Sequence, residues 1–390
     1  MNIAQSIRDM VPLLETWRHA LHSRPETAFQ EHATAALIAR ELRMMGLEVH
    51  EGIAGTGVVG ILRNGAGGSV GLRADIDALD IAETTGLDYA STIPGKMHAC
   101  GHDGHTAMLL GAARAMVEAP PGPGTVVFIF QPAEENEGGA RVMVDAGLFD
   151  RFPVDRVFAM HNWPGLDVGR IAVRPGPMMA AFDTFELTLT GKGSHGAMPH
   201  QGIDPITVAA QVQMAWQTIV SRVIDPTDSA VISVTQVHAG HTLNVIPAEV
   251  ILRGTVRSLR PQTRDLLQSE MAHRAGCVAE AFHATAELTY QRRYPAVEND
   301  PIAAEIARQA ATAVLGPTAV ETALPPSMAS EDFAFMLQKV PGAYLWIGNG
   351  SAEGGRNLHS PNYDFNDAIL PIGVQVLVEA ARRSLRGADG

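Results

Sequence analysis

The stretch FDTFELTLTG, residues 182–191, separates two styles of sequence along the 390-residue chain. Polar and apolar residues alternate strictly in it, with Phe185, Leu187 and Leu189 on one side, which is typical of a strand with one buried face. The segments that follow read, in order, as a helix, two strands, a second helix and a last strand, ATAELTYQRR. The order β-α-β-β-α-β is that of a ferredoxin-like sandwich. We therefore expect residues 181–294 to form a separate α+β domain.

On both sides of this domain the chain alternates helical and strand patterns, as an α/β domain does. The segments TVVFIF and RVFAMH are apolar on both faces, which suits strands inside a sheet that helices cover. Helical periodicity covers about 4–20, 31–46, 104–118, 301–315 and 367–385. We expect one α/β domain with a central sheet flanked by helices, built from residues 1–180 and 295–390, into which the α+β domain is inserted.

The composition excludes several classes of partner. A net charge of −13 repels phosphate backbones, so we expect no nucleic-acid partner. Two cysteines, Cys100 and Cys277, cannot build a disulfide framework. The first residues lack a long apolar segment, and no run of eighteen apolar residues occurs. We therefore expect no signal peptide and no membrane span, and a cytoplasmic location.

The densest cluster of reactive side chains is MHACGHDGH, residues 97–105, just before a predicted helix. Cys100 and His102 are separated by one residue, so both can turn toward the same point. A thiolate and an imidazole are good ligands for a borderline metal ion, and the N-terminus of the helix would help to keep Cys100 deprotonated. The alternative is a buried cysteine among unrelated loop histidines.

A second cluster is QPAEE, residues 131–135, at the end of TVVFIF. The adjacent carboxylates of Glu134 and Glu135 at the carboxyl end of a buried strand are costly unless a cation compensates them. In open α/β sheets that edge is also where ligands bind. The alternative is a solvated pair, but the preceding strand is too apolar to favour it.

Further polar residues follow other predicted strands. His161 ends RVFAMH, Asp75 and Asp77 end SVGLRADID, and His359 lies in a loop after AYLWIG. Each position alone is weak, because a single histidine is more often structural than a ligand. Together these positions bring sulfur, imidazole and carboxylate groups to one edge of one sheet, which indicates a metal site.

Three other chemistries lack their motifs. GTGVVG, residues 55–60, has glycines like those of a dinucleotide site, but a strand follows it instead of a helix. The chain contains no G-x-S-x-G element for a serine nucleophile and no HExxH motif for a single-zinc protease.

The motifs taken together resemble a known family, the bacterial hippurate hydrolases, which are N-acyl-L-amino-acid amidohydrolases related to aminoacylases and plant auxin-conjugate amidohydrolases. The motifs that carry the resemblance are HACGHDGH, QPAEE, GKGSHGAMPHQGIDPI, LNVIPAEV, RGTVRS, MASEDF and LHSPNYDF. The resemblance spans nearly the whole chain. It implies a Zn-peptidase-like catalytic domain, and it implies that the inserted ferredoxin-like domain is a lid and dimerisation domain, in a homodimer or a dimer-based oligomer.

The resemblance also implies two divalent metal ions per subunit, each zinc, manganese, cobalt or nickel. Cys100 would bridge the ions, where distant relatives use an aspartate. His102 and His161 would complete the site of one ion, and Glu135 and His359 the site of the other.

The resemblance implies three further roles toward the substrate, and the carboxylate of the leaving amino acid requires a fourth residue as a donor. Glu134 would be the general base that takes a proton from the attacking water and passes it to the leaving amine. His195 would reach from the lid into the partner subunit's active site and stabilise the oxyanion, and Asn244 would contact the substrate. Arg257 is the candidate for binding the substrate carboxylate, with a solvated strand arginine as the alternative.

The sequence therefore predicts a metal-dependent amidohydrolase that splits benzoyl or acetyl amino acids into a carboxylate and a free amino acid. N-acetyl-diaminopimelate deacetylation and dipeptide cleavage would use the same centre and remain open. A protein that only binds conjugates is disfavoured, because all the ligands and the base are present. Asp75 either orients a ligand or caps a turn, Asp103 is expected to cap its helix, and Glu331 has no assigned role.

Overall fold

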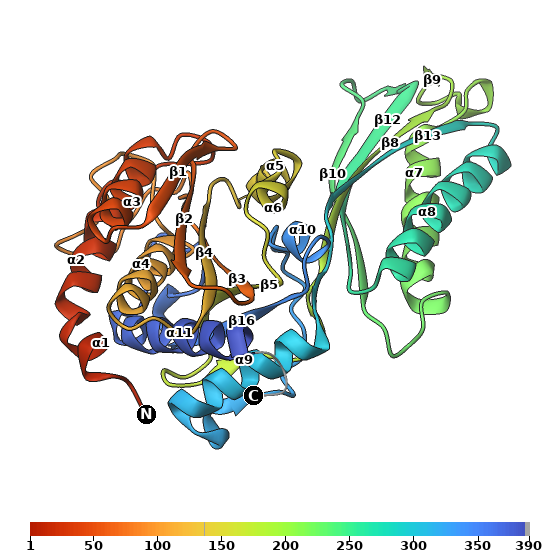
Figure 1. Cartoon of the computed structure of the whole chain (residues 1–390). Helices are drawn as coiled ribbons and strands as arrows, with labels where there is room; N and C mark the ends of the chain where they lie inside the picture. Colours follow the sequence, from red (N-terminus) through yellow and green to blue (C-terminus); the bar gives the residue numbers. More distant parts are fainter. Residues whose placement is uncertain (136, 387–390) are drawn as a thin grey trace. The chain divides into compact units, whose positions relative to one another are not determined.

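The structure is a computed structural model that describes residues 1–135 and 137–386, and it divides into two compact units (Figure 1). The first unit comprises Met1–Met178, Glu298–Pro325 and the described residues from Asp332 onward. The second unit comprises Met179–Val297 and Pro326–Glu331. Each unit has its own hydrophobic core.

An eight-stranded sheet forms the centre of the first unit. Its strands, in spatial order, are β1 (Glu48–Ile53), β2 (Gly57–Asn64), β4 (Gly124–Gln131), β3 (Ser69–Asp75), β5 (Arg156–Pro164), β16 (Gly342–Gly350), β6 (Ile171–Ala172) and β15 (Val320–Glu321). Neighbouring strands within the group β4, β3, β5 and β16 are parallel. Their carboxyl ends therefore share one edge of the sheet, where α/β folds place their ligands.

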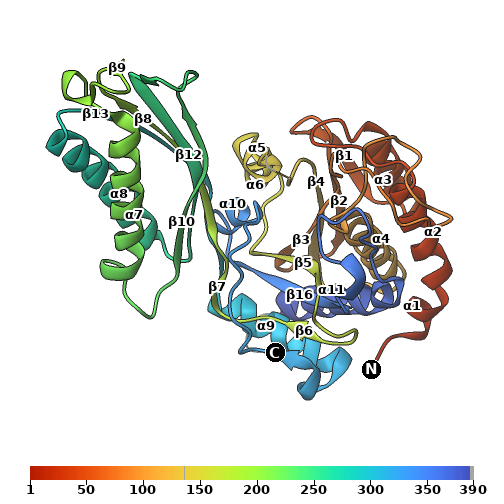
Figure 2. The same ribbon diagram turned by 180° about the vertical axis from the view of Figure 1, so that it is seen from behind.

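Helices cover this sheet, as the apolar strand segments predict (Figures 1 and 2). They are α1 (Gln5–Asp9), α2 (Val11–His22), α3 (His32–Met44), α4 (His102–Glu118), α5 (Gly139–Asp145), α6 (Leu148–Arg151), α9 (Pro301–Leu315), α10 (Ala334–Leu337) and α11 (Leu370–Arg386). Helices α4 and α11 pack on β3, α3 packs on β1 and β2, and α9 packs on β16. Leu72, Phe128 and Phe158 are fully buried beneath them, which confirms the predicted fold of a central sheet flanked by helices.

Two helix boundaries differ from the prediction for local reasons. The periodicity at 4–20 predicts one helix, but the chain forms α1 and α2 with Met10 between them. Pro12 lies in the first turn of α2, where its missing N–H is harmless, whereas the interior of a longer helix would lose a hydrogen bond there. The last helix starts at Leu370 because Asn366 accepts a hydrogen bond from the N–H of Ala368 and holds Asp367–Ile369 in a short 3₁₀ turn.

The second unit is a four-stranded antiparallel sheet with two helices on one face. The strands lie in the order β10 (Ala230–Ala239), β12 (Glu249–Ser258), β8 (Ala181–Thr190) and β13 (Thr285–Tyr294), and the helices are α7 (Pro205–Arg222) and α8 (Pro261–Ala281). Along the chain this is the predicted β-α-β-β-α-β order. Phe185, Leu187 and Leu189 face the helices and are buried, as the alternation in β8 predicts.

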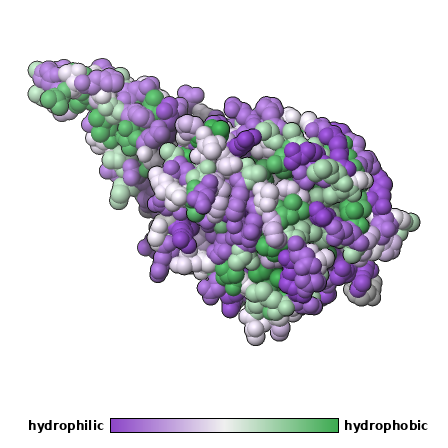
Figure 3. Space-filling view, turned by 90° about the vertical axis from the view of Figure 1, so that its left-hand side faces the viewer, coloured by the Kyte–Doolittle hydropathy of each residue, from purple (hydrophilic) through white to green (hydrophobic). Residues whose placement is uncertain are grey.

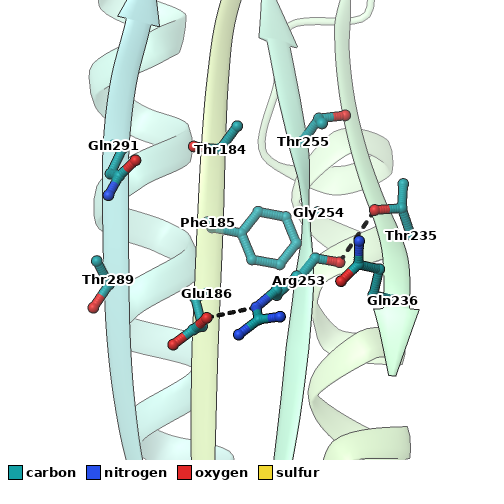
Figure 4. Close-up of a pocket in the computed structure, with 10 residues that line it drawn as sticks. All are labelled: Thr184, Phe185, Glu186, Thr235, Gln236, Arg253, Gly254, Thr255, Thr289 and Gln291. Carbon is teal, nitrogen blue, oxygen red and sulfur yellow. Dashed lines mark hydrogen bonds and ion pairs between the residues drawn. The ribbon is translucent and has the colours of Figure 1, made fainter. Parts of the chain in front are cut away.

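The other face of this sheet carries polar side chains. Figure 4 shows a shallow pocket there, with hydroxyl and amide groups around an ion pair in which Arg253 Nε lies 2.6 Å from Glu186 Oε2. Because this ion pair is satisfied within the pocket, we assign no reactive group to it. A small ribbon of β9 (Ser194–His195) and β11 (Val245–Ile246) completes the unit, and the short strands β7 (Gly176–Met179) and β14 (Val297–Asn299) lie near the boundary between the units.

The exposed surface mixes hydrophilic and hydrophobic residues on the face that Figure 3 shows. Among the large hydrophobic side chains that are exposed, several belong to the second unit: Met198, Ile206, Met214, Val237, Leu243 and Val245. No helix in the described part of the chain combines the length and the apolar character that crossing a membrane requires.

Candidate metal centre

The structure brings the five predicted ligand residues to the carboxyl edge of the central sheet. Sγ of Cys100 lies 3.4 Å from Nε2 of His161, which is part of β5. Nε2 of His359, in the loop after β16, lies 3.0 Å from Oε1 of Glu135, in the loop after β4. Nε2 of His102, at the start of α4, lies 4.0 Å from the same oxygen. Cys100, Glu135 and His359 offer ligand atoms that all lie within 4.8 Å of one another.

A glycine allows Cys100 and His102 to turn toward one point. Gly101 has a φ of 94°, a conformation that other residues adopt only at a cost. A Cβ atom on Gly101 would lie 2.4 Å from Oδ1 of Asn162 and 2.6 Å from the hydroxyl of Tyr363. Only glycine therefore fits between the two predicted ligands.

Two non-glycine residues with positive φ lie at the site. Ala133, directly before Glu134, has a φ of 54°, and His359 itself has a φ of 62°. Hydrogen bonds hold both: the N–H of Ala133 donates to Oε1 of the buried Glu31 at 2.9 Å, and the N–H of His359 donates to the carbonyl of Ala99 at 2.8 Å. Strained residues of this kind persist only where surrounding contacts fix them, and they gather at functional sites.

The predicted imidazole ligands are oriented through their second nitrogen. Nδ1 of His161 donates to the carbonyl of Asn162 at 2.7 Å, which leaves Nε2 directed at Cys100. Nδ1 of His102 lies 3.1 Å from Oδ1 of Asp77, which leaves its Nε2 facing Oδ2 of Asp75 at 3.7 Å and Oε1 of Glu135 at 4.0 Å. Proteins commonly hold metal-binding histidines in this way.

His105 belongs to the same motif but is placed differently. Its Nδ1 lies 2.6 Å from Oδ1 of Asp75, and its Nε2 lies 2.7 Å from Oδ1 of Asn162. Asp75, His102, His105 and His161 also place donor atoms within 4.8 Å of one another. Because both ring nitrogens of His105 have protein partners, we interpret Asp75 and His105 as supports for the neighbouring ligands.

The predicted ligands fit metal ions, both because two of their atoms are buried without hydrogen bonds and because of their chemical types. Nε2 of His102 is buried and makes no hydrogen bond to any described residue, and Oε1 of Glu135 lies near His359 without hydrogen-bond geometry. Buried polar atoms without such bonds cost about 1–3 kcal/mol each. Sulfur, imidazole and carboxylate together suit zinc, cobalt or nickel, and the carboxylates also suit manganese.

The charges around the centre also favour a cation. Burial and the carboxylates of Glu135 and Glu134 raise the pKa of the Cys100 thiol well above its usual value. The help expected from the N-terminus of α4 in keeping Cys100 deprotonated is therefore opposed by burial and by these two carboxylates. For His102, burial lowers the pKa, but Asp75 and Asp77 outweigh burial and raise it to about 10. Binding of an ion must displace both protons, so the ion supplies the charge that this cluster lacks.

The predicted base lies beside the ligands. Glu134 is 7% exposed, and one of its carboxylate oxygens lies within 4.8 Å of ligand atoms of His102 and Glu135. Its Oε1 accepts a hydrogen bond of 3.3 Å from the N–H of Asp332. Glu134 therefore has a defined orientation at the centre.

The other predicted residues belong to the second unit. His195, in β9, pairs with Val245 of β11, and its Nδ1 accepts a hydrogen bond of 3.0 Å from the N–H of Ala197. The carbonyl of Asn244 accepts a hydrogen bond of 2.8 Å from the N–H of Gly196, so His195 and Asn244 lie on one exposed ribbon.

Arg257, in β12, is half-buried, and its guanidinium carbon lies 4.2 Å from the ring centre of Phe182. No carboxylate among the described residues forms an ion pair with it. The role of Arg257, as a donor to the substrate carboxylate or as a solvated strand arginine, therefore stays a prediction.

Sequence reasoning missed the buried supports of the centre. Asp103 does not cap α4: its Oδ2 lies 2.8 Å from Nδ1 of His22 and 3.3 Å from a guanidinium nitrogen of Arg18. Arg73 and Asp332 form a second buried ion pair. The sequence does indicate that Arg73 has such a partner. Arg73 is a charged residue within the mostly apolar strand SVGLRAD, and a buried charge requires a counter-ion.

Comparisons with known proteins show the family of the chain. Residues 71–383 match peptidase family M20/M25/M40. Hippurate hydrolase of Campylobacter jejuni is 38% identical over 99% of this chain and 100% of its own length, and N-acetylcysteine deacetylase of Bacillus subtilis is 39% identical over 93% and 94%. The solved structure of the Bacillus subtilis YXEP protein, a dinuclear metal-binding peptidase, superposes with a TM-score of 0.86 at 35% identity, covering 97% of this chain and 99% of that one. The chain belongs to peptidase family M20/M25/M40 and is a hydrolase of that family.

Proposed function

We propose that the protein is a two-metal amidohydrolase that cleaves the amide bond of N-acyl amino acids. The observation that carries the proposal is the convergence of Cys100, His102, Glu135, His161 and His359, in which Nε2 of His102 and Oε1 of Glu135 are buried without a hydrogen bond to any described residue. The similarity to a hippurate hydrolase and an N-acetylcysteine deacetylase supports benzoyl and acetyl groups as the acyl part.

The chain's own residues divide the work. The predicted ligands would hold two divalent ions, which when bound polarise the amide carbonyl and lower the pKa of water. Glu134 takes the proton of the attacking water and delivers it to the nitrogen of the leaving amino acid, which departs as an amine. Glu135, adjacent in sequence, is directed at His359, whose Nε2 lies 3.0 Å from its Oε1, and would serve as a ligand.

The second unit acts as a lid and dimerisation domain over residues 181–294 in this proposal. His195 stabilises the oxyanion in the partner subunit's site, and Asn244 contacts the substrate from the same ribbon. Their exposed position and the exposed hydrophobic side chains of this unit, such as Leu243 and Met214, support a homodimer. Arg257 binds the substrate carboxylate, which is supported by the absence of an ion pair between it and any carboxylate in the described part of the chain.

The central experiment is the Glu134→Gln variant of the metal-loaded enzyme. Turnover of benzoyl-glycine and N-acetyl amino acids should fall by at least about 10²–10⁴-fold, the range of general acid–base catalysis, while two ions remain bound. Glu137→Gln, an exposed acid three residues away, is the matched control. Full activity of Glu134→Gln would refute the assignment of the base.

The preferred conjugate is decided by a substrate panel. Relative rates on benzoyl, acetyl and dipeptide conjugates, with N-acetyl-diaminopimelate included, separate the proposed activity from the two related ones. Release of no amino acid from any conjugate by the metal-loaded protein would instead indicate a binding protein.

A further inference from the structure

A closed network of buried polar side chains lies next to Glu134. Arg73, in β3, is 3% exposed, and Asp332 is fully buried. A guanidinium nitrogen of Arg73 donates to Oδ1 of Asp332 at 3.1 Å. Gln131, at the end of β4, bridges the two: its Oε1 accepts from Nε of Arg73 at 2.7 Å, and its Nε2 donates to both oxygens of Asp332 at 2.9 and 3.0 Å.

The carboxylate of Asp332 receives donors on both oxygens. Besides Arg73 and Gln131, the N–H of Ala140, in α5, donates to Oδ2 at 2.8 Å. A carboxylate accepts on both oxygens, whereas the amide of asparagine accepts on one and donates from the other side. The geometry therefore specifies aspartate at this position, because an amide group would point N–H groups at other N–H groups in either orientation.

The network extends to the predicted base through the backbone of Asp332. The N–H of Asp332 donates to Oε1 of Glu134 at 3.3 Å. Because the side chain of Asp332 is held at both oxygens, its backbone N–H is held as well. The direction of the Glu134 carboxylate is therefore coupled to the ion pair.

The other arm of Arg73 reaches toward the predicted ligands. It donates to Oδ2 of Asp75 at 2.9 Å, and Asp75 in turn supports His105. One buried guanidinium thus links the acid beside the histidines to the acid beside the base. Such fully satisfied networks fix a geometry, whereas partly satisfied ones are costly.

We propose that Asp332 is a positioning residue for Glu134, and that Arg73 and Gln131 hold Asp332 in place for this role. The proposal deepens the proposed function and rests on it for its kinetic consequence. The proposal gives Asp332, the second acid of the SEDF motif, a physical role. The network keeps the carboxylate of Glu134 directed at the water that it deprotonates, and the network itself does not contact the substrate.

The test uses Asp332→Asn in the metal-loaded enzyme. We expect kcat to fall by about 10–100-fold with KM changed by less than about threefold, as for loss of an interaction made in the transition state. Two ions per subunit should remain bound. An increase in KM with kcat unchanged, or no change in either constant, would overturn the proposal.

A double-mutant cycle distinguishes positioning from loss of stability. Because Asp332 acts through Glu134, Asp332→Asn should change the residual rate of the Glu134→Gln variant by less than about threefold. Multiplicative losses in the double variant would show that the effects are independent, and would contradict the proposal. The matched control is Asp183→Asn in the second unit, which breaks another buried pair, with Arg264, and should lower the melting temperature without this kinetic pattern.

Two further measurements keep the proposal testable if Asp332→Asn folds poorly or if no conjugate is cleaved. Gln131→Met keeps the length of the side chain and the Arg73–Asp332 pair but removes the bridge, and should show a smaller loss of kcat with the same pattern. A crystal structure of either variant should show the Glu134 carboxylate rotated or in several conformers, with Cys100 and His102 in place. An unmoved Glu134 would overturn the positioning role, whereas absence of turnover in the wild type would overturn only the proposed function.

Discussion

Asp77 holds the ring of His102 and the backbone N–H of Glu135 with one carboxylate. Its Oδ1 lies 3.1 Å from Nδ1 of His102, and its Oδ2 accepts a hydrogen bond of 3.0 Å from the N–H of Glu135. Two predicted ligands, one at the start of α4 and one in the loop after β4, are therefore set by one buried acid. This places Asp77 immediately behind the metal centre.

Replacement of Asp77 by asparagine should weaken the binding of metal ions. Outer partners of metal-binding histidines contribute about 10–100-fold to affinity, because they fix the ring and increase its basicity. Competition with a chromophoric chelator would measure the loss. Asp80→Asn, an exposed acid three residues away, serves as the control. Equal affinities of Asp77→Asn and wild type would show that His102 is oriented by other contacts.

The two ions should differ in how easily a chelator removes them. The side chain of His359 is 52% exposed, whereas His102 and His161 are buried. We expect the ion assigned to Glu135 and His359 to leave first during titration with a chelator. His359→Ala should lower the affinity of this ion by more than the roughly 10–100-fold of an outer partner, and His32→Ala, an exposed histidine of α3, should not. Simultaneous loss of both ions in His359→Ala would contradict this assignment.

The sequence predicted those parts of the fold and site that depend on local pattern. Alternation in β8 placed Phe185, Leu187 and Leu189 in the core, and the position of His161 at the end of an apolar run placed it at the ligand edge. Both follow from rules that relate a residue to its own strand. The catalytic and ligand roles of these site residues stay predictions, as do those of His195, Asn244 and Arg257.

The supports of the centre depend on partners far away in the sequence. Asp103 contacts His22, 81 positions away, and Arg73 contacts Asp332, 259 positions away. A charge in an apolar strand shows that a partner is needed, but it does not identify that partner. For Asp103 the local rule favoured a helix cap, whereas the buried charges of Arg18 and His22 form stronger contacts.

The His22–Asp103 pair should make stability depend on pH. Burial lowers the pKa of His22, but attraction to Asp103 and hydrogen bonds from its ring outweigh burial and raise the pKa to about 9. The folded protein then binds a proton between about pH 6.5 and 9 that the unfolded chain does not, so stability falls as pH rises through this window. The contribution lost is about 3 kcal/mol.

The comparison with His22→Gln isolates this contribution. The difference in the free energy of unfolding between wild type and variant should be largest below about pH 6.5 and should shrink toward pH 9, because glutamine does not titrate. Chemical denaturation at a series of pH values measures it. A difference that stays constant over this range would mean that His22 is not charged in the folded protein.

Gly101→Ala should disrupt the centre through geometry alone. The positive φ of Gly101 costs other residues roughly 1–2 kcal/mol. The added Cβ would also lie less than 3 Å from side-chain atoms of Asn162 and Tyr363, which is a steric clash. Because Gly101 joins Cys100 to His102, the shift that relieves this overlap must move at least one of them, so we expect both lower stability and fewer than two bound ions.

Gly86→Ala is the matched control: its φ is 70°, but no atom lies within 4 Å of the added Cβ, so only the backbone cost applies and metal content should stay at two. Thermal unfolding and metal analysis of the two variants separate the effects. Two tightly bound ions in Gly101→Ala would mean that the close approach of this loop to β5 is not required for the predicted site.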